Sequence, residues 1–329
     1  MSRHLLRRQF SSAALGLAIV AAFAPLHALA QAADYPSAPI RLVVPLPPGG
    51  ASDHVARMLG EHLQTAWKQP VVIDNKPGGN GIIGAQAVAR AAPDGYTLLI
   101  GVPSISTFKA FLKNPPIDTA KDLVPVAQLV KNPYVLAVPT ALPITTVREL
   151  VDYAKARPGK LNYAGLAGGQ TLAVEYFNQV AGIDVMRVPY KGEAPAVMAL
   201  AANEAQVTLA SRFGLAPILE KGQARALAVT TPRRLAQLPD VPTLDESGFK
   251  GFDVSVWLGV LAPVGLPTGL RDRIAGEVSV FLRKPDVVAA LAKSGHTPVI
   301  AGPAEFGRLI DSEIARWADV ARKAEIEPQ

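Results

Sequence analysis

The chain contains no cysteine and only 5 histidines among its 329 residues. The lack of cysteine excludes disulfides, thiolate metal sites and cysteine nucleophiles. The apolar share of 49% excludes an intrinsically disordered chain and is ample for a hydrophobic core. Because no disulfide can hold the fold together, core packing has to supply its stability.

Motifs of catalysis and metal binding are absent as well. Three histidines lie beyond residue 30, at His54, His62 and His296, and they lack the spacing of metal ligands. The sequence has no H-E-x-x-H and no G-x-S-x-G nucleophile elbow. His62 falls on an apolar helix face, which favours a core or boundary position. We therefore expect no metal, no cofactor and no enzymatic activity, although scattered serines and acids leave a hydrolase open.

Residues 1–30 have the pattern of a signal peptide. Three arginines precede an apolar run at 13–24, and Ala28-Leu29-Ala30 resembles a cleavage site. The apolar run is too short to span a membrane. We predict an exported protein whose mature chain begins near Gln31. Arg7-Arg8 is compatible with both Sec and twin-arginine export.

The charge is mild once this leader is removed. The formal net charge is +6, and the leader contributes three arginines and no acids, which leaves +3 for the mature chain. The basic residues do not cluster, so nothing favours binding to nucleic acid or to a membrane surface. The length fits two domains or one large domain.

A proline- and glycine-rich loop at 45–53 is the feature around which the chain is organised. It joins an apolar strand at 40–44 to an amphipathic helix that ends near residue 67. Ser52 and Asp53 are good N-cap residues, and the free N–H groups at a helix start suit an anion. We interpret the loop as half of a ligand-binding cleft, and an ordinary strand-to-helix turn is the alternative.

The strand–loop–helix pattern then recurs along the chain. Further strands at 71–74 and 96–100 predict a parallel sheet, and a second set of strands and glycine loops follows the proline-rich stretch after residue 115. A strand at 257–262 is expected to return to the first sheet, and only helices are expected after Pro263. We predict the following division of the chain: a leader at 1–30, a first lobe at 31–132 plus 254–329, and a second lobe at 133–253, with a hinge where the chain crosses.

The sequence at 79–84 is a literal G-x-G-x-x-G, but its context argues against a dinucleotide site. The first motif glycine, Gly79, stands five residues beyond the end of the strand at 71–74 instead of directly at it, and no acidic residue closes the next strand. The loop is expected either to shape a cleft or to form a tight turn. Lys191 and Arg212 follow strands of the second unit, where each would face an acidic ligand or simply solvent.

Ten short motifs in this order resemble the substrate-binding proteins of tripartite tricarboxylate transporters, the Bug or TctC family. The resemblance extends over 34–329. The motifs stand at residues 35–36, 39–45, 47–50, 69–72, 75–78, 92–99, 161–164, 188–192, 225–230 and 238–243.

This resemblance implies an α/β fold of the type II-like periplasmic binding proteins, with two α/β lobes around a ligand cleft and a hinge. It implies a monomeric periplasmic protein that captures a small organic acid, a carboxylate in particular, by closing its cleft. Delivery to membrane permease subunits of a tripartite tricarboxylate-type transporter would follow. A sensory protein that presents its closed form to a receptor is the alternative, and a periplasmic enzyme is a third. The ligand itself is not readable from the sequence.

The resemblance also implies a set of ligand-binding residues. They come from four loops: Pro47, Pro48, Gly49, Gly50, Ser52 and Asp53; Ser104 and Ile105; Gly168, Gly169, Gln170 and Thr171; and Tyr190, Lys191 and Gly192.

Two departures from the family pattern fall in the second lobe. The glycine loop is shorter than usual and ends in Gln170-Thr171, where the family has threonine or serine and then histidine. Arg212 takes the position of an aspartate that could hold an amine in family members that bind amino acids. Our hypothesis is that Arg212 removes tolerance for an amine and favours a second acidic group, and the alternative is that it points outward.

Overall fold

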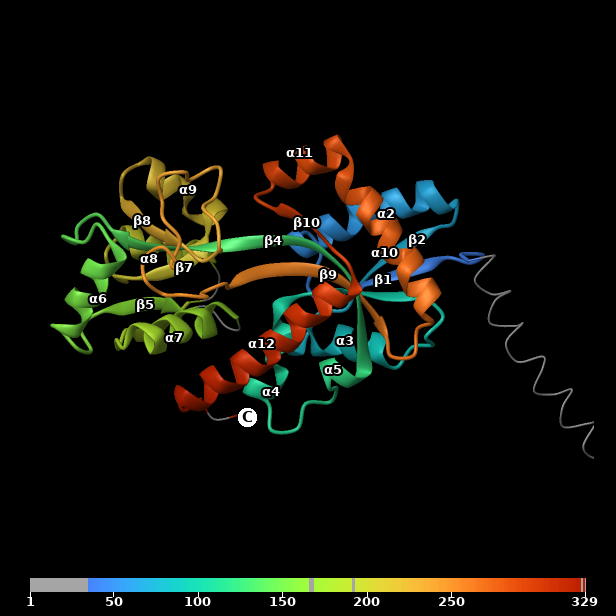
Figure 1. Ribbon diagram of the computed structural model, residues 1–329, viewed down its shortest axis with the longest axis horizontal. Coiled ribbons are helices and arrows are strands. Elements are labelled where there is room, and N and C mark those ends of the chain that lie inside the picture. The colour runs from blue at the N-terminus through green and yellow to red at the C-terminus, as the bar shows by residue number, and fades with distance from the viewer. Residues whose placement is uncertain (1–34, 166–168, 191–192, 327, 329) are drawn as a thin grey trace, which may run out of the picture.

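The computed structural model describes residues 35–165, 169–190, 193–326 and 328, and within them it forms two α/β lobes joined by long strands (Figure 1). The predicted leader and the predicted site residues Gly168, Lys191 and Gly192 lie outside the described residues. No helix in the described ranges combines the length and the apolar character that crossing a membrane requires.

The first lobe is built on a sheet of six strands in the order β10-β4-β9-β3-β1-β2. β1, β2 and β3 run parallel, and β9 is antiparallel to both β3 and β4, as expected for the returning strand. These strands are β1 (Ile40–Val44), β2 (Val71–Asn75), β3 (Thr97–Gly101), β4 (Leu123–Pro139), β9 (Ser255–Pro263) and β10 (Thr297–Ala301). The helices of this part are α2 (Ala51–Trp67), α3 (Ile82–Ala89), α4 (Phe108–Phe111), α5 (Thr119–Asp122), α10 (Thr268–Arg283), α11 (Pro285–Lys293) and α12 (Pro303–Lys323), with short 3-10 turns η1 (Gly79–Gly81) and η2 (Pro103–Thr107).

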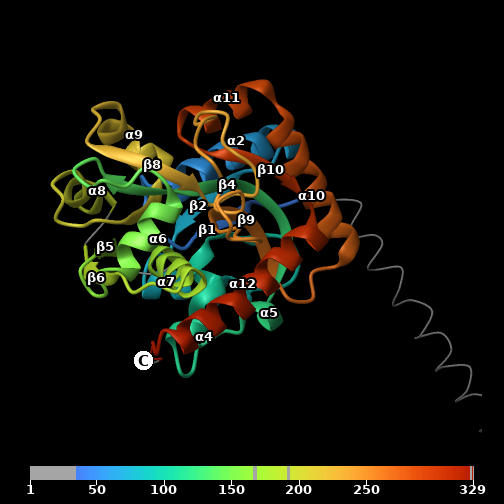
Figure 2. The same cartoon turned by 60° about the vertical axis from the view of Figure 1, so that its left-hand side comes forward.

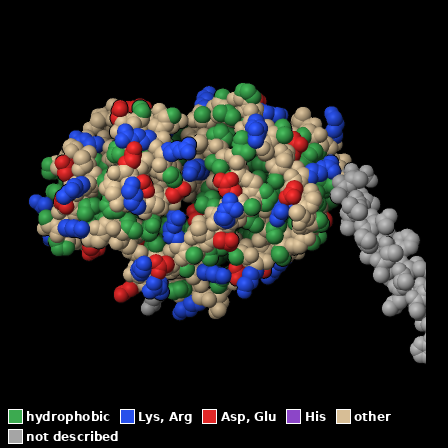
Figure 3. Space-filling model, in the orientation of Figure 1, with side chains coloured by type: hydrophobic (Ala, Val, Ile, Leu, Met, Phe, Trp, Pro, Cys, Tyr) green, Lys and Arg blue, Asp and Glu red, His purple; other side chains and the backbone are tan. Residues whose placement is uncertain are grey.

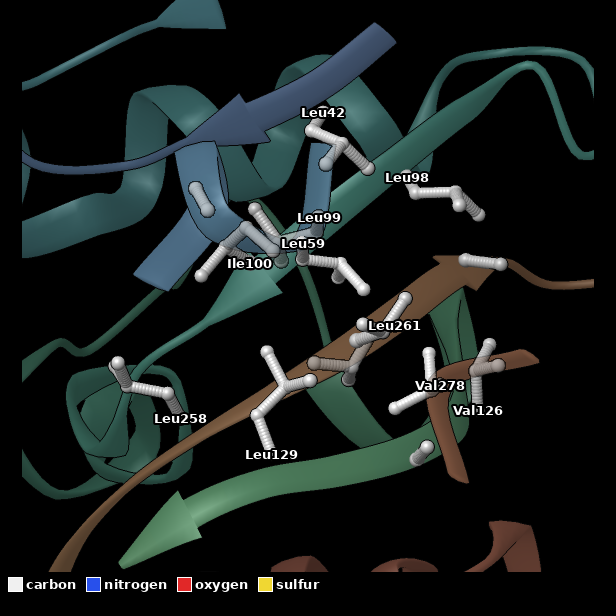
Figure 4. Packing of buried hydrophobic residues seen from close by; sticks show 14 of the residues in the cluster. Leu42, Leu59, Leu98, Leu99, Ile100, Val126, Leu129, Leu258, Leu261 and Val278 are labelled. Atoms are coloured by element: carbon white, nitrogen blue, oxygen red, sulfur yellow. The ribbon is translucent and has the colours of Figure 1, made fainter. Parts of the chain in front are cut away.

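The core of this lobe lies between the sheet and its helices. Side chains of β1, β3 and β9, among them Leu42, Leu99 and Leu261, pack with Leu59 of α2 and Val278 of α10 (Figure 4). All of these are almost completely removed from solvent. The sheet is covered on both faces, which explains why its strands read as continuous apolar runs rather than as alternating ones.

The second lobe is smaller. β7 and β8 are antiparallel to β4, and β5 and β6 form a separate parallel pair that a single bridge, Tyr163 to Val207, connects to the start of β7. Its elements are α6 (Val147–Lys155), β5 (Asn162–Gly165), α7 (Gly169–Ala181), β6 (Met186–Pro189), α8 (Glu193–Ala201), β7 (Thr208–Ser211), α9 (Arg212–Glu220) and β8 (Ala224–Val229). A capping box of Thr146 and Glu149 starts α6.

A single strand, β4, passes through both lobes. Its residues up to Pro133 pair with β9, and from Tyr134 onward they pair with β7 and β8. In this region of the chain, the sequence predicted strands only after the proline-rich stretch that begins at residue 115, because prolines are typical strand breakers. The pairing with β9 shifts register just after Pro125, at the kind of irregularity that tolerates proline in a sheet. We propose lobes at 31–132 plus 254–329 and at 133–253, as the sequence predicts. The exchange of strand partners at Pro133 supports this boundary.

The C-terminal part corrects a second prediction. The three helices are present, but β10 lies between the last two and pairs antiparallel with β4. β10 was not predicted, because the five residues that follow Gly295-His296 show no clear alternation of apolar and polar side chains.

The last helix, α12, connects the lobes. Phe306 and Ile310, in its first half, belong to the core of the first lobe, whereas Trp317 and Val320 pack into the core of the second. Both ribbon views show α12 running from beneath the first sheet to the side of α7 (Figures 1 and 2). Sequence reasoning had assigned the C-terminal helices to the first lobe alone.

Candidate functional site

The loop after β1 is exposed and leads into an uncapped helix. Pro47 to Gly50 are exposed, and Gly49 has a φ of +84°, a conformation that glycine adopts most readily. The N-cap of α2 is Gly50 and has no side-chain hydrogen bond, so the predicted capping role of Ser52 and Asp53 is wrong. Both side chains are buried within the first turn. The first N–H groups of α2 therefore remain available to an anion.

Asp53 holds this loop in place. Its carboxylate accepts hydrogen bonds from Gly49 N–H (3.0 Å), from Arg57 Nε and Nη2 (2.9 and 3.1 Å) and from Asn75 Nδ2 (3.0 Å). Asn75 also donates to the carbonyl oxygen of Leu46. Chiefly through Arg57, and further through Gly49 and Asn75, these contacts lower the pKa of Asp53 to about 2. The carboxylate is directed at its own loop, so we assign it a positioning role.

We expect Asp53→Ala to weaken ligand binding about tenfold by releasing the loop, and to lower the unfolding free energy by about 1–3 kcal/mol through lost charged hydrogen bonds. Calorimetric titration and denaturant unfolding measure the two effects. Glu149→Ala is the matched control, because Glu149 also lies in a first helical turn and accepts hydrogen bonds from backbone N–H groups, but in α6 at the far end of the second lobe. A destabilised Asp53→Ala protein with unchanged affinity would contradict the positioning role.

A second wall of the site comes from η2, which follows β3. Ser104 is half-buried, and its hydroxyl has no hydrogen-bond partner within the described residues. Gly81 packs against it, since a Cβ at that position would lie 3.2 Å from Ser104 Oγ. Ile105 is only 1% exposed and belongs to the core, so its side chain supports the turn from below.

The second lobe meets η2 at the start of α7. A Cβ on Gly169 would lie 4.0 Å from Pro103 Cβ, which shows how close the two lobes are here. Gln170 and Thr171 are buried, and Gln170 Nε2 donates to the carbonyl oxygen of Ala164. Tyr190 is half-buried, and its N–H donates to the carbonyl oxygen of Gly165 (2.9 Å). The structure thus brings the start of α7, with the predicted residue Gly169, against the turn η2 that carries Ser104 and Ile105.

Arg212 lies between the lobes. It is the first residue of α9, directly after Ser211, whose N–H donates to Glu193 Oε1 (2.6 Å). Arg212 and Ser211 line a pocket whose other side is formed by Asn132 of β4 and by His296, just before β10. Sequence reasoning missed Asn132 and His296, because neither stands in a motif and 164 residues separate them.

The described residues were not found to form a metal site, and the charges on the visible face are mixed. The described ranges contain no group of three or more histidine, aspartate or glutamate residues arranged to hold a metal ion. On the face shown in Figure 3, acidic and basic side chains are interspersed over both lobes. That face lacks the basic stripe typical of nucleic-acid binding.

Comparison with known proteins gives a family over most of the chain. The TctC family, described as "Tripartite tricarboxylate transporter family receptor", matches residues 55–326. Protein BugT of Bordetella pertussis is 35% identical over 311 residues, which cover 93% of this chain and 95% of BugT.

Solved structures agree with this match. The structure of Rpa4515 of R. palustris with adipate is 36% identical, has a TM-score of 0.73, and covers 90% of this chain and 100% of that one. MatC of Rhodopseudomonas palustris with bound malate is 30% identical with a TM-score of 0.69, and covers 87% of this chain and 100% of that one. The predicted two-lobed α/β fold is confirmed by these likenesses.

Proposed function

The chain belongs to the tripartite tricarboxylate transporter receptor family, a family of solute-binding proteins and not of enzymes, and from that premise we propose that it captures a small carboxylate between its lobes. The observation that carries the proposal is the exposed loop at the uncapped start of α2, which Asp53 holds in place, together with the neighbouring turn η2, against which α7 of the second lobe begins. Two relatives bind adipate and malate, which are both carboxylates.

The proposed ligand site combines backbone donors with polar side chains from both lobes. Its residues are those that the sequence suggested: Pro47, Pro48, Gly49, Gly50, Ser52, Asp53, Ser104, Ile105, Gly168, Gly169, Gln170, Thr171, Tyr190, Lys191, Gly192 and Arg212.

Within this set the residues take different roles. N–H groups of the loop and of the first turn of α2 bind a carboxylate, helped by the positive end of the helix. Ser104 is placed to donate a hydroxyl hydrogen bond, while Asp53 and Ile105 position their loops. Ordered water fills the space between ligand and backbone, so ligands of different shape can share one carboxylate-binding wall.

Cleft closure is the proposed signal for transport. We propose that the protein is exported to the periplasm by the leader at 1–30 and, once closed on its ligand, docks on membrane permease subunits of a tripartite tricarboxylate-type transporter. The hinge consists of β4 and β9, the strands that run between the lobes. A monomer suffices for this role, because both walls of the site come from one chain.

A thermal-shift screen of the mature protein, residues 31–329, tests the proposal. The panel consists of mono-, di- and tricarboxylates, aromatic acids and acidic amino acids, each paired with its neutral amide. Saturation at about 100 times Kd adds roughly 2.7 kcal/mol of stability, so a cognate acid should raise Tm by several degrees. The amides should have no effect. A panel without any shift, or amides as effective as acids, would refute carboxylate binding.

A further inference from the structure

We propose that the pocket between Arg212 and His296 is a second anion subsite, which binds the distal carboxylate of a ligand that carries two carboxylate groups. This inference rests on the proposed function and names its ligand class. The pocket lies between the lobes and offers about 20 Å³ of room, which exceeds the need of one water molecule but is far below that of a whole ligand. Its polar lining consists of Asn132, Ser211, Arg212, Gln237, His296 and Thr297.

Arg212 supplies a cation that the fold leaves uncompensated. Within the described part of the chain it makes neither an ion pair nor a hydrogen bond, although it is half-buried. The nearby Glu193 is engaged by the N–H of Ser211, the residue before it. A carboxylate would stabilise a half-buried guanidinium that has no ion-pair partner, because the two groups can form two parallel hydrogen bonds.

His296 supplies a second polar group that is 95% buried, since it is only 5% exposed. The side-chain amide of Asn132 engages its Nδ1 at 2.7–2.9 Å in either orientation of the amide. With the Asn132 oxygen toward the ring, the amide nitrogen also reaches the carbonyl oxygens of Lys131 and Gly295. Nε2 is left without a partner among the described residues, in a side chain that lines the pocket.

The pocket neighbours the proposed carboxylate loop. Burial lowers the pKa of His296, and the nearby His54, in the first turns of α2, lowers it further. The start of α2 and the pocket therefore belong to the same interlobe region. One carboxylate at the start of α2 and another at Arg212 would bridge the lobes and favour the closed form.

The charged groups around His296 give the pocket a dependence on pH. They are His54 on α2, Arg212 on α9, and Lys131 on β4, which pairs with Asp253. A carboxylate placed against Nε2 favours the imidazolium form, so binding should take up a proton. Affinity for a two-carboxylate ligand should then rise as pH falls from 8 to 6, by at most about tenfold per pH unit.

The test is calorimetric titration of the mature protein with succinate, glutarate and adipate, each paired with its monomethyl ester. We expect the wild type to bind the best diacid about ten- to hundredfold more tightly than its monoester, the range that charged hydrogen bonds supply. Arg212→Gln should abolish this difference by lowering the affinity for the diacid to that for its monoester. His296→Asn should reduce it and remove the rise at low pH.

Lys221→Gln is the matched control, because Lys221 is an exposed cation at the opposite end of α9. Denaturant unfolding of each variant checks that it is folded. An Arg212→Gln protein that keeps the preference for diacids, or that loses diacid and monoester binding equally, would overturn the subsite and leave the proposed function standing. A wild type that binds no acid of any kind would overturn both.

Discussion

Gly84→Ala is expected to displace the loop after β1, and with it to lower both stability and ligand affinity. Gly84 lies in α3 with its Cα against the start of that loop. A Cβ there would lie 2.8 Å from the Cα and Cβ of Pro45 and 3.2 Å from the carbonyl oxygen of Lys76. Two of these atoms belong to the backbone, so no side-chain rotation relieves the clash. We expect the unfolding free energy to fall by about 2 kcal/mol, within the range for overpacked interiors.

The effect on function should be larger than stability alone explains. Pro45 precedes the exposed segment that ends at Gly50, and a shift of Pro45 moves the N–H groups that are proposed to bind the carboxylate. We expect affinity for the best acid to fall at least about tenfold, because a displacement of about an ångström strains several hydrogen bonds at once. Denaturant unfolding and calorimetric titration on the same preparation measure both quantities.

Gly276→Ala is the control for this substitution. Gly276 lies inside α10, and a Cβ there would meet nothing within 4 Å. Alanine should therefore stabilise that helix by about 0.5–1 kcal/mol and leave binding unchanged. If Gly84→Ala behaved like Gly276→Ala, close packing of α3 on Pro45 would not be what holds the loop.

The role of Gly84 also explains the G-x-G-x-x-G that the sequence presents. The context of this motif argues against a dinucleotide site and leaves a cleft-shaping loop or a tight turn. In the structure Gly79 and Gly81 have positive φ, as a tight turn requires, and Gly84 permits close approach of a helix to the neighbouring loop. The same spacing of glycines thus serves packing that supports the candidate site.

Features determined by local pattern were predictable from sequence. The periods of β1, α2, β2 and β3 and the capping threonine of α6 are signals contained within a few residues. The family resemblance then added the two-lobed architecture. The start of α2 shows where local rules end. Ser52 and Asp53 are good capping residues, yet the N-cap is Gly50, two residues before Ser52, and the Asp53 carboxylate accepts hydrogen bonds from Gly49 and Asn75.

Features that depend on distant parts of the chain were not predictable. β4 changes partners midway, and α12 packs on both lobes, although neither segment carries a distinctive pattern for it. The pocket beside Arg212 was not predictable for the same reason, because the pairing of β10 with β4 is what brings His296 next to Asn132. A solitary histidine or asparagine offers no signal of its partner in a single sequence.

The helix α12 carries a buried acid that makes stability dependent on pH. Glu313 is 2% exposed and accepts a hydrogen bond from Trp257 Nε1 (2.7 Å). Burial raises the pKa of Glu313 from 4.5 to about 7, and Trp257, Arg316 and the Ser106 hydroxyl offset part of this rise. Asp253 acts in the same direction as burial. The folded protein therefore binds this proton more tightly than the unfolded chain.

We expect Glu313→Gln to stabilise the protein increasingly as the pH rises. Between about pH 4.5 and about pH 7 the wild type loses stability, because deprotonation leaves a buried charge in the folded state. Glutamine keeps an acceptor for Trp257 and cannot ionise. The gain of Glu313→Gln over the wild type should thus grow by roughly 3 kcal/mol across this range and stay constant above it. Denaturant unfolding at pH 4.5, 6, 7 and 8 measures the gain.

Asp319→Asn is the control on the same helix. Asp319 is paired with Lys323 and Arg322, which lower its pKa. The charged form of Asp319 therefore stabilises the folded protein above the unfolded pKa, and this contribution disappears as the pH falls and the carboxylate is protonated. The sign is therefore opposite to that at Glu313, and exposure keeps the effect small. A gain of Glu313→Gln that did not change with pH would mean that the carboxyl remains in one protonation state throughout. In that case α12 would join the lobes through packing alone, with no titrating group at their junction.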